Sequence, residues 1–456
     1  MTGDDSRLFG LGPDEQKLLA EQLRTARRTS GRAEPERRRS ASVVVPEHYG
    51  QIKELPNYKN IRNQLALGKQ KNIFSSFFAC HETRAKNRTR INGEEFLNFS
   101  TYDYLGLNGH PEVNKAAIEA LEEFGTSAGA SRLVAGERPQ HRAFEKALAD
   151  CYGVEDSVVF VSGHATNVST LPALLGNNDV VFHDSLAHNS IITGARLSGA
   201  ARYSYTHNDH KELERLLREN RSKYQRALIV TEGVFSMDGD IANLPELIAL
   251  KREHTCFLMI DEAHALGVLG PTGRGLAEHF DVDPSDVDIW MGTLSKTLCG
   301  CGGYIAGCAE LIELLKFTAS GFVFSVGMPP PIAAASRKAL ELMLREPERV
   351  ARLQAVSRFF LNEARARGLD TGRAQGYAVV PVMAGSSLVA GYLSAALYDR
   401  RFNVLPIVHP AVEEGLARLR FFLSAEHREE DMIAVLDAVA EELPKARAKA
   451  NSPETA

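Results

Sequence analysis

The chain has 456 residues, a net charge of −5 and 24% charged residues, which is the composition of an ordinary globular protein. This length favours two domains over a single core. The near balance of charges provides no basic field that would attract nucleic acid and no acidic tail. No run of about eighteen apolar residues occurs, so no membrane span is predicted. The first residues also lack the charged-then-apolar order of a secretory signal.

Six cysteines are spread along the chain, without zinc-type CxxC pairs and without the density of a disulfide framework. We therefore expect reduced thiols in a cytoplasmic enzyme. No HExxH spacing occurs either, so no metal site is predicted. Cys299 and Cys301 are interpreted as small packing residues.

Residues 1–45 differ in composition from the rest of the chain. Residues 13–28 have leucines at helical spacing, with Pro13 suited to a first turn. Residues 29–42 are rich in Arg, Ser and Glu and nearly free of large apolar residues, which predicts a mobile linker. We expect residues 46–96 to form an N-terminal segment that precedes the main fold.

From residue 97 onward, short apolar runs alternate with helical stretches. The runs lie at residues 158–161, 180–182, 228–230, 257–260 and 289–291. This alternation predicts an α/β large domain over residues 97–331, with a mostly parallel sheet covered by helices on both faces. After three prolines, a helix is expected from Ile332 to Leu344, and it opens a smaller α+β domain over residues 332–456.

An acid and a lysine follow two successive predicted strands. Asp261 ends the apolar run 257–260, and Lys296 follows the run 289–291. Buried parallel strands deliver such residues to the carboxyl edge of one sheet. Pyridoxal phosphate chemistry needs an amine that binds the cofactor aldehyde and an anion that keeps the ring nitrogen protonated. The pair therefore predicts a pyridoxal phosphate site.

Residues 162–167 (SGHATN) follow a predicted strand and open a helical stretch. A helix start with free backbone amides suits a phosphate group, so Ser162 and Gly163 are candidate phosphate ligands. His164 would place a flat ring beside the cofactor. His188, in a later loop, would stack on the pyridine face and reach a substrate carboxylate, and an ordinary surface histidine is the alternative interpretation.

His264 follows Asp261 by three residues and is assigned to the phenolic oxygen of the cofactor or to the support of Asp261. Ser236, in a strand-end loop, is expected near the same oxygen. Thr293 and Ser295 are candidate phosphate ligands. The string DEAH around these residues also matches a helicase box, but the chain has no GxxxxGK[ST] phosphate loop, so a helicase is excluded.

Several motifs occur in a fixed order between about Phe96 and His427: NFSTYDYLGL, SGHATN, THND, EGVFSMDGD, IDEAHALG, GTLSK and ARLR. In this order they resemble the α-oxoamine synthase family of fold-type I pyridoxal phosphate enzymes. The resemblance implies an aspartate-aminotransferase-like large domain with a smaller C-terminal domain. It also implies an obligate homodimer whose sites lie between the subunits.

The resemblance implies roles for the residues around the cofactor. Lys296 would hold the cofactor and act as the catalytic base. Asp261 would contact the ring nitrogen, His264 the ring oxygen and Thr293 the phosphate, while His188 would stack on the ring and help to grip the substrate.

The resemblance also implies roles for residues around the substrates. His207 and Ser236 would lie near the ring and the thioester, with His207 as a catalytic donor to the developing oxyanion. Arg420 would anchor the amino-acid carboxylate, because a guanidinium binds a carboxylate through two hydrogen bonds. Ser325 would reach the phosphate of the partner subunit.

Two positions depart from the common pattern of the family. Tyr102 stands where many members have Asn, which is more similar to the serine palmitoyltransferase branch, and we expect it to contact a substrate. The C-terminal loop 407–412 contains His409 where relatives commonly begin with Arg or Tyr, and His409 is expected to alter selectivity.

The expected reaction is a decarboxylative Claisen-type condensation of glycine, alanine or serine with an acyl thioester, which gives an α-amino ketone. Residues 11–19 resemble linkers that border carrier-protein modules, so the acyl donor is either an acyl carrier protein or coenzyme A, and the sequence does not decide between them. The sequence decides neither the amino acid nor the acyl chain. An aldolase or aminotransferase on the same fold, or a non-catalytic partner subunit, are the alternative functions.

Overall fold

The computed structural model describes residues 45–71, 73 and 77–452, so the helix and linker predicted within residues 1–44 lie outside it. The chain divides into two compact units, Met1–Leu67 and Gly68–Ala456. In the first unit, the short helices η2 (Glu47–Gly50) and η3 (Ile52–Glu54) precede the start of α2 (Pro56–Gln70), which buries none of its residues. Within the described residues, no helix is long and apolar enough to cross a membrane.

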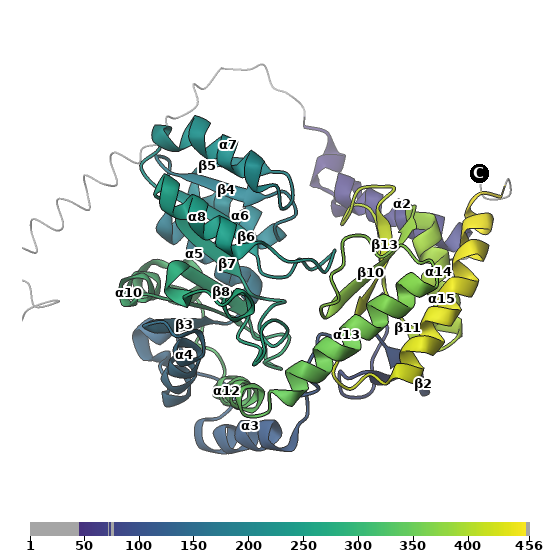
Figure 1. The fold of residues 1–456 in the computed structure, drawn as a ribbon, viewed down its shortest axis with the longest axis horizontal. Helices are drawn as coiled ribbons and strands as arrows, with labels where there is room; N and C mark the ends of the chain where they lie inside the picture. Colours follow the sequence, from purple (N-terminus) through teal and green to yellow (C-terminus); the bar gives the residue numbers. More distant parts are fainter. Residues whose placement is uncertain (1–44, 72, 74–76, 453–456) are drawn as a thin grey trace, which may run out of the picture. The chain divides into compact units, whose positions relative to one another are not determined.

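The second unit contains a seven-stranded sheet with the order β3-β9-β8-β7-β6-β4-β5 (Figure 1). The strands are β3 (Asp156–Phe160), β4 (Val180–Asp184), β5 (Ala201–Tyr205), β6 (Ala227–Glu232), β7 (Phe257–Asp261), β8 (Ile289–Thr293) and β9 (Gly303–Gly307). Strands β8, β7, β6, β4 and β5 are parallel, whereas β9 is antiparallel to both of its neighbours. The predicted mostly parallel sheet is confirmed. The sequence interpretation missed β5, a polar edge strand, and the glycine-containing β9.

The strands of this sheet are apolar on both faces because helices cover both. Along β6, Ala227 and Ile229 belong to one apolar core, and Leu228 and Val230 belong to the other. The first core includes side chains of α3 (Pro111–Phe124), α4 (Pro139–Tyr152), α7 (His210–Asn220), α8 (Leu244–His254) and α9 (Leu276–Phe280). The second includes side chains of α5 (Gly163–Leu174), α6 (Asn189–Ser198), α10 (Ala309–Thr318) and α11 (Ser320–Val323). Burial on both sides is why these strands read as unbroken apolar runs.

The C-terminal domain contains two three-stranded sheets, β1-β2-β11 and β10-β13-β12. Their strands are β1 (Arg88–Ile91), β2 (Glu94–Asn98), β10 (Val379–Gly385), β11 (Phe402–Asn403), β12 (Pro406–Ile407) and β13 (Ala417–Phe422). The helices are α13 (Glu348–Ala366), α14 (Ser387–Asp399) and α15 (Glu429–Ala450), and they pack around a separate apolar core. Because β2 pairs in parallel with β11, residues 88–98 belong to this domain, although residues 46–96 were expected as a separate segment.

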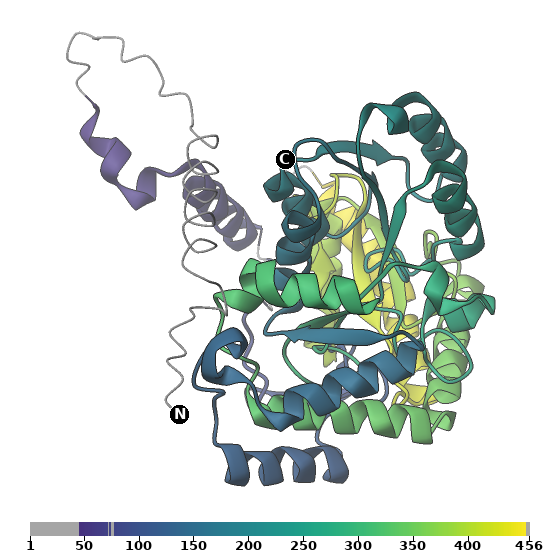
Figure 2. The ribbon, with the colours of Figure 1, turned by 90° about the vertical axis from the view of Figure 1, so that its left-hand side faces the viewer.

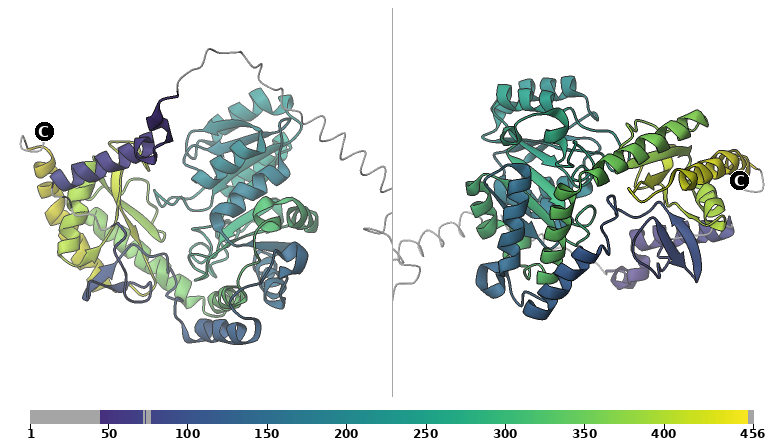
Figure 3. Two further views of the ribbon diagram at one scale, coloured as in Figure 1. Left: turned by 180° about the vertical axis from the view of Figure 1, so that it is seen from behind. Right: turned by 60° about the horizontal axis from the view of Figure 1, so that its bottom comes forward.

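Helix α12 (Pro330–Arg345) confirms the helix predicted near residues 332–344. It packs against α3 and α4 (Figure 2), and its residues Leu340 and Met343 belong to the first core of the large sheet. The following helix α13 leads into the C-terminal domain (Figure 3). Helix α12 therefore packs with the large sheet, and α13 has side chains in both cores, with Val350 and Leu353 in the first and Val356 and Phe360 in that of the C-terminal domain.

Candidate active site

The carboxyl ends of the parallel strands bring the predicted acid and lysine to one edge of the large sheet. Asp261 is the last residue of β7, and Lys296 follows three residues after β8 ends at Thr293. Strands β7 and β8 pair in parallel, with Asp261 opposite Met291. This is the edge at which ligands bind in open α/β sheets.

The Asp261 carboxylate is buried and held by neutral donors. Asn167 Nδ2 donates to Asp261 Oδ2 at 2.9 Å, and the backbone N–H of Ala263 donates to Oδ1 at 3.0 Å. Asn167 Nδ2 also lies 2.9 Å from Ser190 Oγ, which is 2.7 Å from His188 Nδ1. The acid and the predicted stacking histidine are therefore joined through Asn167 and Ser190. Sequence reasoning missed both, although Asn167 lies within the SGHATN turn.

Lys296 lies among charged groups that act on its ammonium in opposite directions. Burial lowers the pKa of Lys296 to about 8, because the negative charge shared by the adjacent acids Asp261 and Glu232 offsets only part of the desolvation, and the charge of Arg420 lowers this pKa further. The Nζ atom lies 5.8 Å from the centre of the Tyr102 ring. A lysine in this environment loses its proton far more readily than one in water.

Glu232 is a second buried acid that the sequence interpretation missed. It ends β6 directly beside Asp261 in the parallel register and is 4% exposed. Burial, followed by the charge of Asp261, raises the pKa of Glu232 well above its usual value. The raised pKa favours the protonated form of Glu232, so the pair carries less negative charge than two free carboxylates would. The only available signal was its position at the end of an apolar run.

His264 follows Asp261 by three residues and is hydrogen-bonded to a tyrosine. The Tyr104 hydroxyl lies 2.7 Å from His264 Nδ1, and both side chains are buried. Burial, with the positive charges of Lys296 and Arg420, lowers the pKa of His264 well below its usual value. A hydroxyl proton donated to Nδ1 leaves the ring proton of neutral His264 on Nε2, from which it can be donated to a ligand oxygen.

The turn at the start of α5 meets the end of β8. Ser162 caps α5 by accepting the backbone N–H of Ala165 at 3.3 Å. A Cβ atom added to Gly163 would lie 2.7 Å from Thr293 Oγ1, so glycine permits this close approach. Thr293 Oγ1 also lies 3.4 Å from Ser295 Oγ. Four of the predicted phosphate ligands thus gather at one helix N-terminus, which favours an anion.

The two histidines expected beside the cofactor ring face each other. The ring centroids of His164 and His188 are 6.4 Å apart, with an interplanar angle of 78°, and both residues are exposed. Desolvation is the main cause that lowers the pKa of His188. The charge of Asp261 raises this pKa, and the charges of Lys296 and His164 lower it further. His188 is therefore neutral at pH 7, as a stacking ring should be.

Arg420 projects from β13 of the C-terminal domain toward the loop after β6. Its Nη1 donates to the backbone oxygen of Ser236 at 3.0 Å, and its Cζ lies 4.4 Å from the centre of the Phe422 ring. Its Nε is buried and has no partner among the described residues. Burial is the first cause of the lowered pKa of Arg420. The guanidinium therefore keeps unused donors for an anion.

Both ring nitrogens of His207 form hydrogen bonds to carboxylates. Nδ1 lies 3.0 Å from Asp184 Oδ1, and Nε2 lies 2.7 Å from Asp240 Oδ2. These carboxylates outweigh the desolvation of the ring and raise the pKa of His207 to about 9. Both N–H groups are committed to carboxylates, so this geometry does not support the expected donation from His207 to a substrate oxyanion.

Ser325 lies apart from this cluster, in the half-exposed loop between α11 and α12. This loop is attached to residues 130–131, because the N–H of Gly327 donates to Ala130 O at 2.9 Å and Ser131 Oγ donates to Val323 O at 2.7 Å. His409 follows β12 and is also exposed.

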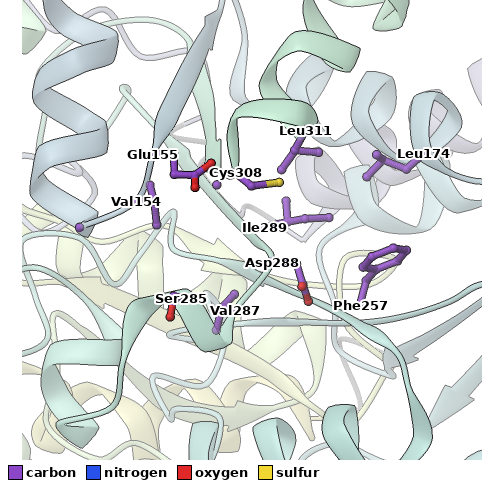
Figure 4. Close-up of a pocket in the computed structure, with 12 residues that line it drawn as sticks. Val154, Glu155, Leu174, Phe257, Ser285, Val287, Asp288, Ile289, Cys308 and Leu311 are labelled. Carbon is purple, nitrogen blue, oxygen red and sulfur yellow. The ribbon is translucent and has the colours of Figure 1, made fainter.

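Two hollows differ in their relation to this cluster. One, with a volume of about 350 Å³, is lined by Tyr102, Asp103, Ser295, Lys296, Cys299 and Gly300, among others. A larger one, of about 520 Å³, lies between the start of β8 and α10 (Figure 4). Its acids already have partners: Glu155 accepts the N–H of Ala309, and Asp288 pairs with Lys251. Only the smaller hollow opens onto the lysine.

The donor set fits pyridoxal phosphate. A buried carboxylate suits a protonated ring nitrogen, a neutral histidine suits a phenolic oxygen, a capped helix start suits a phosphate, and a lysine with a lowered pKa suits an aldehyde. Asp261, His264, Ser162 and Lys296 supply these four groups within one cluster.

The chain is similar to proteins of known type over most of its length. The family model for aminotransferase class I and II matches residues 94–439. The chain is 46% identical over 360 residues to the 8-amino-7-oxononanoate synthase of Geobacter sulfurreducens, a match that covers 78% of this chain and 90% of that protein. The synthase of Symbiobacterium thermophilum is 42% identical, with 77% and 90% covered.

Solved structures of proteins of these types have a fold similar to that of this chain. The serine palmitoyltransferase of Sphingomonas wittichii superposes with a TM-score of 0.81 at 29% identity, covering 86% of this chain and 98% of that one. The 8-amino-7-oxononanoate synthase of Francisella tularensis gives a TM-score of 0.67 at 25% identity, with 77% and 99% covered. The chain belongs to the aminotransferase class I and II family, and within it is an α-oxoamine synthase, a pyridoxal phosphate enzyme that condenses an amino acid with an acyl thioester with loss of carbon dioxide.

Proposed function

We propose that Lys296, Asp261 and Arg420 form the centre at which this chain joins a small amino acid to an acyl thioester. The observation that carries the proposal is a pair of opposite charges left without ion-pair partners. Among the described residues, the buried Asp261 carboxylate accepts only neutral N–H donors, and Arg420 donates only to neutral acceptors, with Nε unpaired. Charges held out of water are costly unless paired. A ring N–H and a substrate carboxylate would supply the missing partners.

Pyridoxal phosphate, when bound, supplies an electron sink that stabilises negative charge on the Cα atom of the amino acid. Asp261 keeps the proton on the ring nitrogen, and Asn167 and Ala263 N hold the carboxylate in place. His264 donates from Nε2 to the phenolic oxygen, with Ser236 as a second candidate there. Ser162, Gly163, Thr293 and Ser295 bind the phosphate.

Lys296 is the proton carrier of the reaction. With a pKa of about 8, its amine is partly neutral at physiological pH, so it can remove the Cα proton. Arg420 holds the substrate carboxylate while this happens, and His188 covers the ring. Condensation breaks the C–S bond and releases the thiol, carbon dioxide is then lost, and the ammonium of Lys296 returns a proton to the same carbon. Tyr102, which lies 5.8 Å from Lys296 Nζ, bounds the space that the thioester must enter.

Glycine, L-alanine and L-serine are the candidate amino acids, and a visible spectrum distinguishes them. We expect the absorbance of the bound cofactor to change on addition of one of the three at low millimolar concentration. Carbon dioxide release on addition of an acyl thioester would then establish the condensation. A protein that stays colourless after reconstitution with pyridoxal phosphate would contradict the proposal.

An acyl carrier protein is the proposed source of the acyl group. Residues 1–93 lie before the region that the family model matches, and residues 22–46 contain seven Arg against two Glu. A basic segment is suited to an acidic carrier. The test compares kcat/KM for one acyl group on a carrier protein and on coenzyme A. A clear preference for coenzyme A would contradict a carrier donor without affecting the condensation itself.

A homodimer is the proposed assembly, with Ser325 of each subunit serving the other's phosphate site. The exposed apolar residues around Ser325 support it: Phe324 is 85% exposed and Val326 49%, and Leu133 and Val134 are exposed in the segment to which this loop is attached. Such a patch is typical of a protein interface.

All six cysteines are free thiols, which supports a reducing compartment such as the cytoplasm.

A further inference from the structure

The loop that follows β6 connects the two domains at the active site. It runs from Gly233 to Ile241 and returns on itself: the N–H of Phe235 donates to Asp240 O, and the N–H of Gly239 donates to Phe235 O, both at 2.9 Å. This loop, hereafter the Ser236 loop, carries the serine expected at the cofactor oxygen. Its tip and its base are attached to different parts of the protein.

The tip of the Ser236 loop is attached to the C-terminal domain. Arg420 Nη1 donates to Ser236 O at 3.0 Å, and Arg418 donates to Met237 O at 3.1 Å and to Asp238 Oδ1 at 2.9 Å. At Gly239 the loop backbone touches β10 so closely that an added Cβ would lie 2.0 Å from a backbone oxygen. The position of the loop therefore decides where the Arg420 guanidinium stands.

The base of the Ser236 loop is attached to the large sheet through His207. Asp240 Oδ2 accepts hydrogen bonds from His207 Nε2 at 2.7 Å and Asn208 Nδ2 at 3.1 Å, while Asp240 Oδ1 is buried with no partner in the described part of the chain. The other ring nitrogen of His207 bonds both oxygens of Asp184, at 3.0 and 3.1 Å. The His207 ring also meets Phe235 edge-on, with centroids 4.3 Å apart.

Asp184 in turn orders the loop that carries His188. Its Oδ1 accepts the N–H of Leu186 at 2.8 Å, and its Oδ2 accepts the N–H of Asn208 at 2.9 Å. The three side chains Asp184, His207 and Asp240 are nearly inaccessible to solvent. Two buried carboxylates this close need a cation between them, and the raised pKa of His207, about 9, means that the ring supplies it at neutral pH.

We propose that His207 is a positioning residue that, between Asp184 and Asp240, fixes the Ser236 loop and through it the amino-acid grip of Arg420. His207 acts without contacting the substrate, because its two N–H groups donate to Asp184 and Asp240. The role of Arg420 in this chain of effects rests on the proposed function. The fixing of the loop does not.

The test variant is His207→Gln, whose amide has donor hydrogens on one nitrogen only and no positive charge, so it cannot bridge both acids. His210→Gln is the matched control, because His210 lies three residues away and pairs with Glu246 instead. Hydrogen exchange of residues 233–241 is measured in the apoprotein and the holoenzyme. For His207→Gln we expect exchange at least about tenfold faster in both, confined to this loop and its anchors. The control should match the unsubstituted protein.

Kinetics with the amino acid give the second readout. We expect His207→Gln to raise the KM for the amino acid by at least about tenfold while kcat stays within about threefold. Unchanged exchange in the loop would overturn the proposal, whatever the activity. A fall in kcat with unchanged KM would also overturn it and place His207 in the chemistry. If His207→Gln fails to fold, Asp240→Asn tests the same two expectations, because it removes one of the bridged charges.

Discussion

Glu232 and Asp261 end two adjacent parallel strands in register, so that two buried acids lie side by side in the active site. The raised pKa of Glu232 removes the repulsion that two ionised carboxylates would have. Asn167 Nδ2 and the N–H of Ala263 donate to the two oxygens of Asp261. The two neighbouring acids therefore differ: burial favours the neutral form of Glu232, whereas the Asp261 carboxylate accepts hydrogen bonds from neutral donors.

Amide substitutions should separate the two acids. Asp261→Asn removes the charge that holds the ring proton, and we expect kcat to fall by about a hundred- to a thousandfold. Glu232→Gln replaces one neutral group by another of the same shape, and we expect kcat at pH 7 to stay within about threefold. Steady-state kinetics with the same substrates check both. Equal losses in the two variants would contradict the protonation states assigned here.

The amine of Lys296 should govern cofactor binding through its protonation. Because only the neutral amine attacks an aldehyde, the rate at which the apoprotein binds pyridoxal phosphate should rise with pH and level off above about 8. Stopped-flow absorbance measures this rate. Lys296→Ala should abolish both the absorbance of the bound cofactor and turnover, whereas Lys146→Ala, an exposed lysine paired with Asp150, should change neither. Normal turnover in Lys296→Ala would refute the assignment.

Arg420 should contribute to amino-acid binding rather than to folding. Loss of a charge-assisted pair costs about 2 to 3 kcal/mol, so Arg420→Gln should raise the KM for the amino acid by about 30- to 150-fold. Arg400→Gln, a surface residue paired with Glu441, is the control and should leave this KM unchanged. The KM of the acyl thioester should be little affected. A selective rise in the KM for the thioester would instead show that Arg420 binds the thioester and not the amino acid.

Glu262 should make the protein less stable at high pH. It is fully buried, and burial raises its pKa from 4.5 to about 8, against the opposing bond from the N–H of Leu276. A raised folded-state pKa means that the stabilisation is complete below pH 4.5 and is lost as the pH rises through about 8, on the order of a few kcal/mol. Urea unfolding between pH 5 and 9 should show this slope. Glu262→Gln should flatten it, and Glu119→Gln, at an exposed position, should not.

The exposed loop at Ser325 should determine assembly. Val134→Asp combined with Phe324→Asp places two charges on the apolar patch, and we expect the mass measured by light scattering to fall from a dimer to a monomer. Leu197→Asp, at another exposed apolar position, is the control. A dimer that survives the double substitution would show that another surface holds the subunits together.

The sequence by itself determined the parallel core and placed an acid and a lysine at the ends of two of its strands. Strands buried on both faces must be continuously apolar, so β4, β6, β7 and β8 were visible as runs, and the acid and lysine after β7 and β8 were visible as their ends. The motif order also indicated the family, which the relatives and solved structures confirm.

Only the tertiary structure decided which side chains meet. Asn167, Ser190 and Tyr104 join the site through partners far away in the chain, so spacing along the sequence does not show their roles. The end of an apolar run marks Glu232, but only the strand pairing places it beside Asp261. The same reason explains His207: a histidine beside two distant acids looks like a free donor until the fold brings Asp184 and Asp240 to its two nitrogens. Local pattern follows from burial, which is a property of each residue, whereas hydrogen-bond partnership is a property of pairs that only folding brings together.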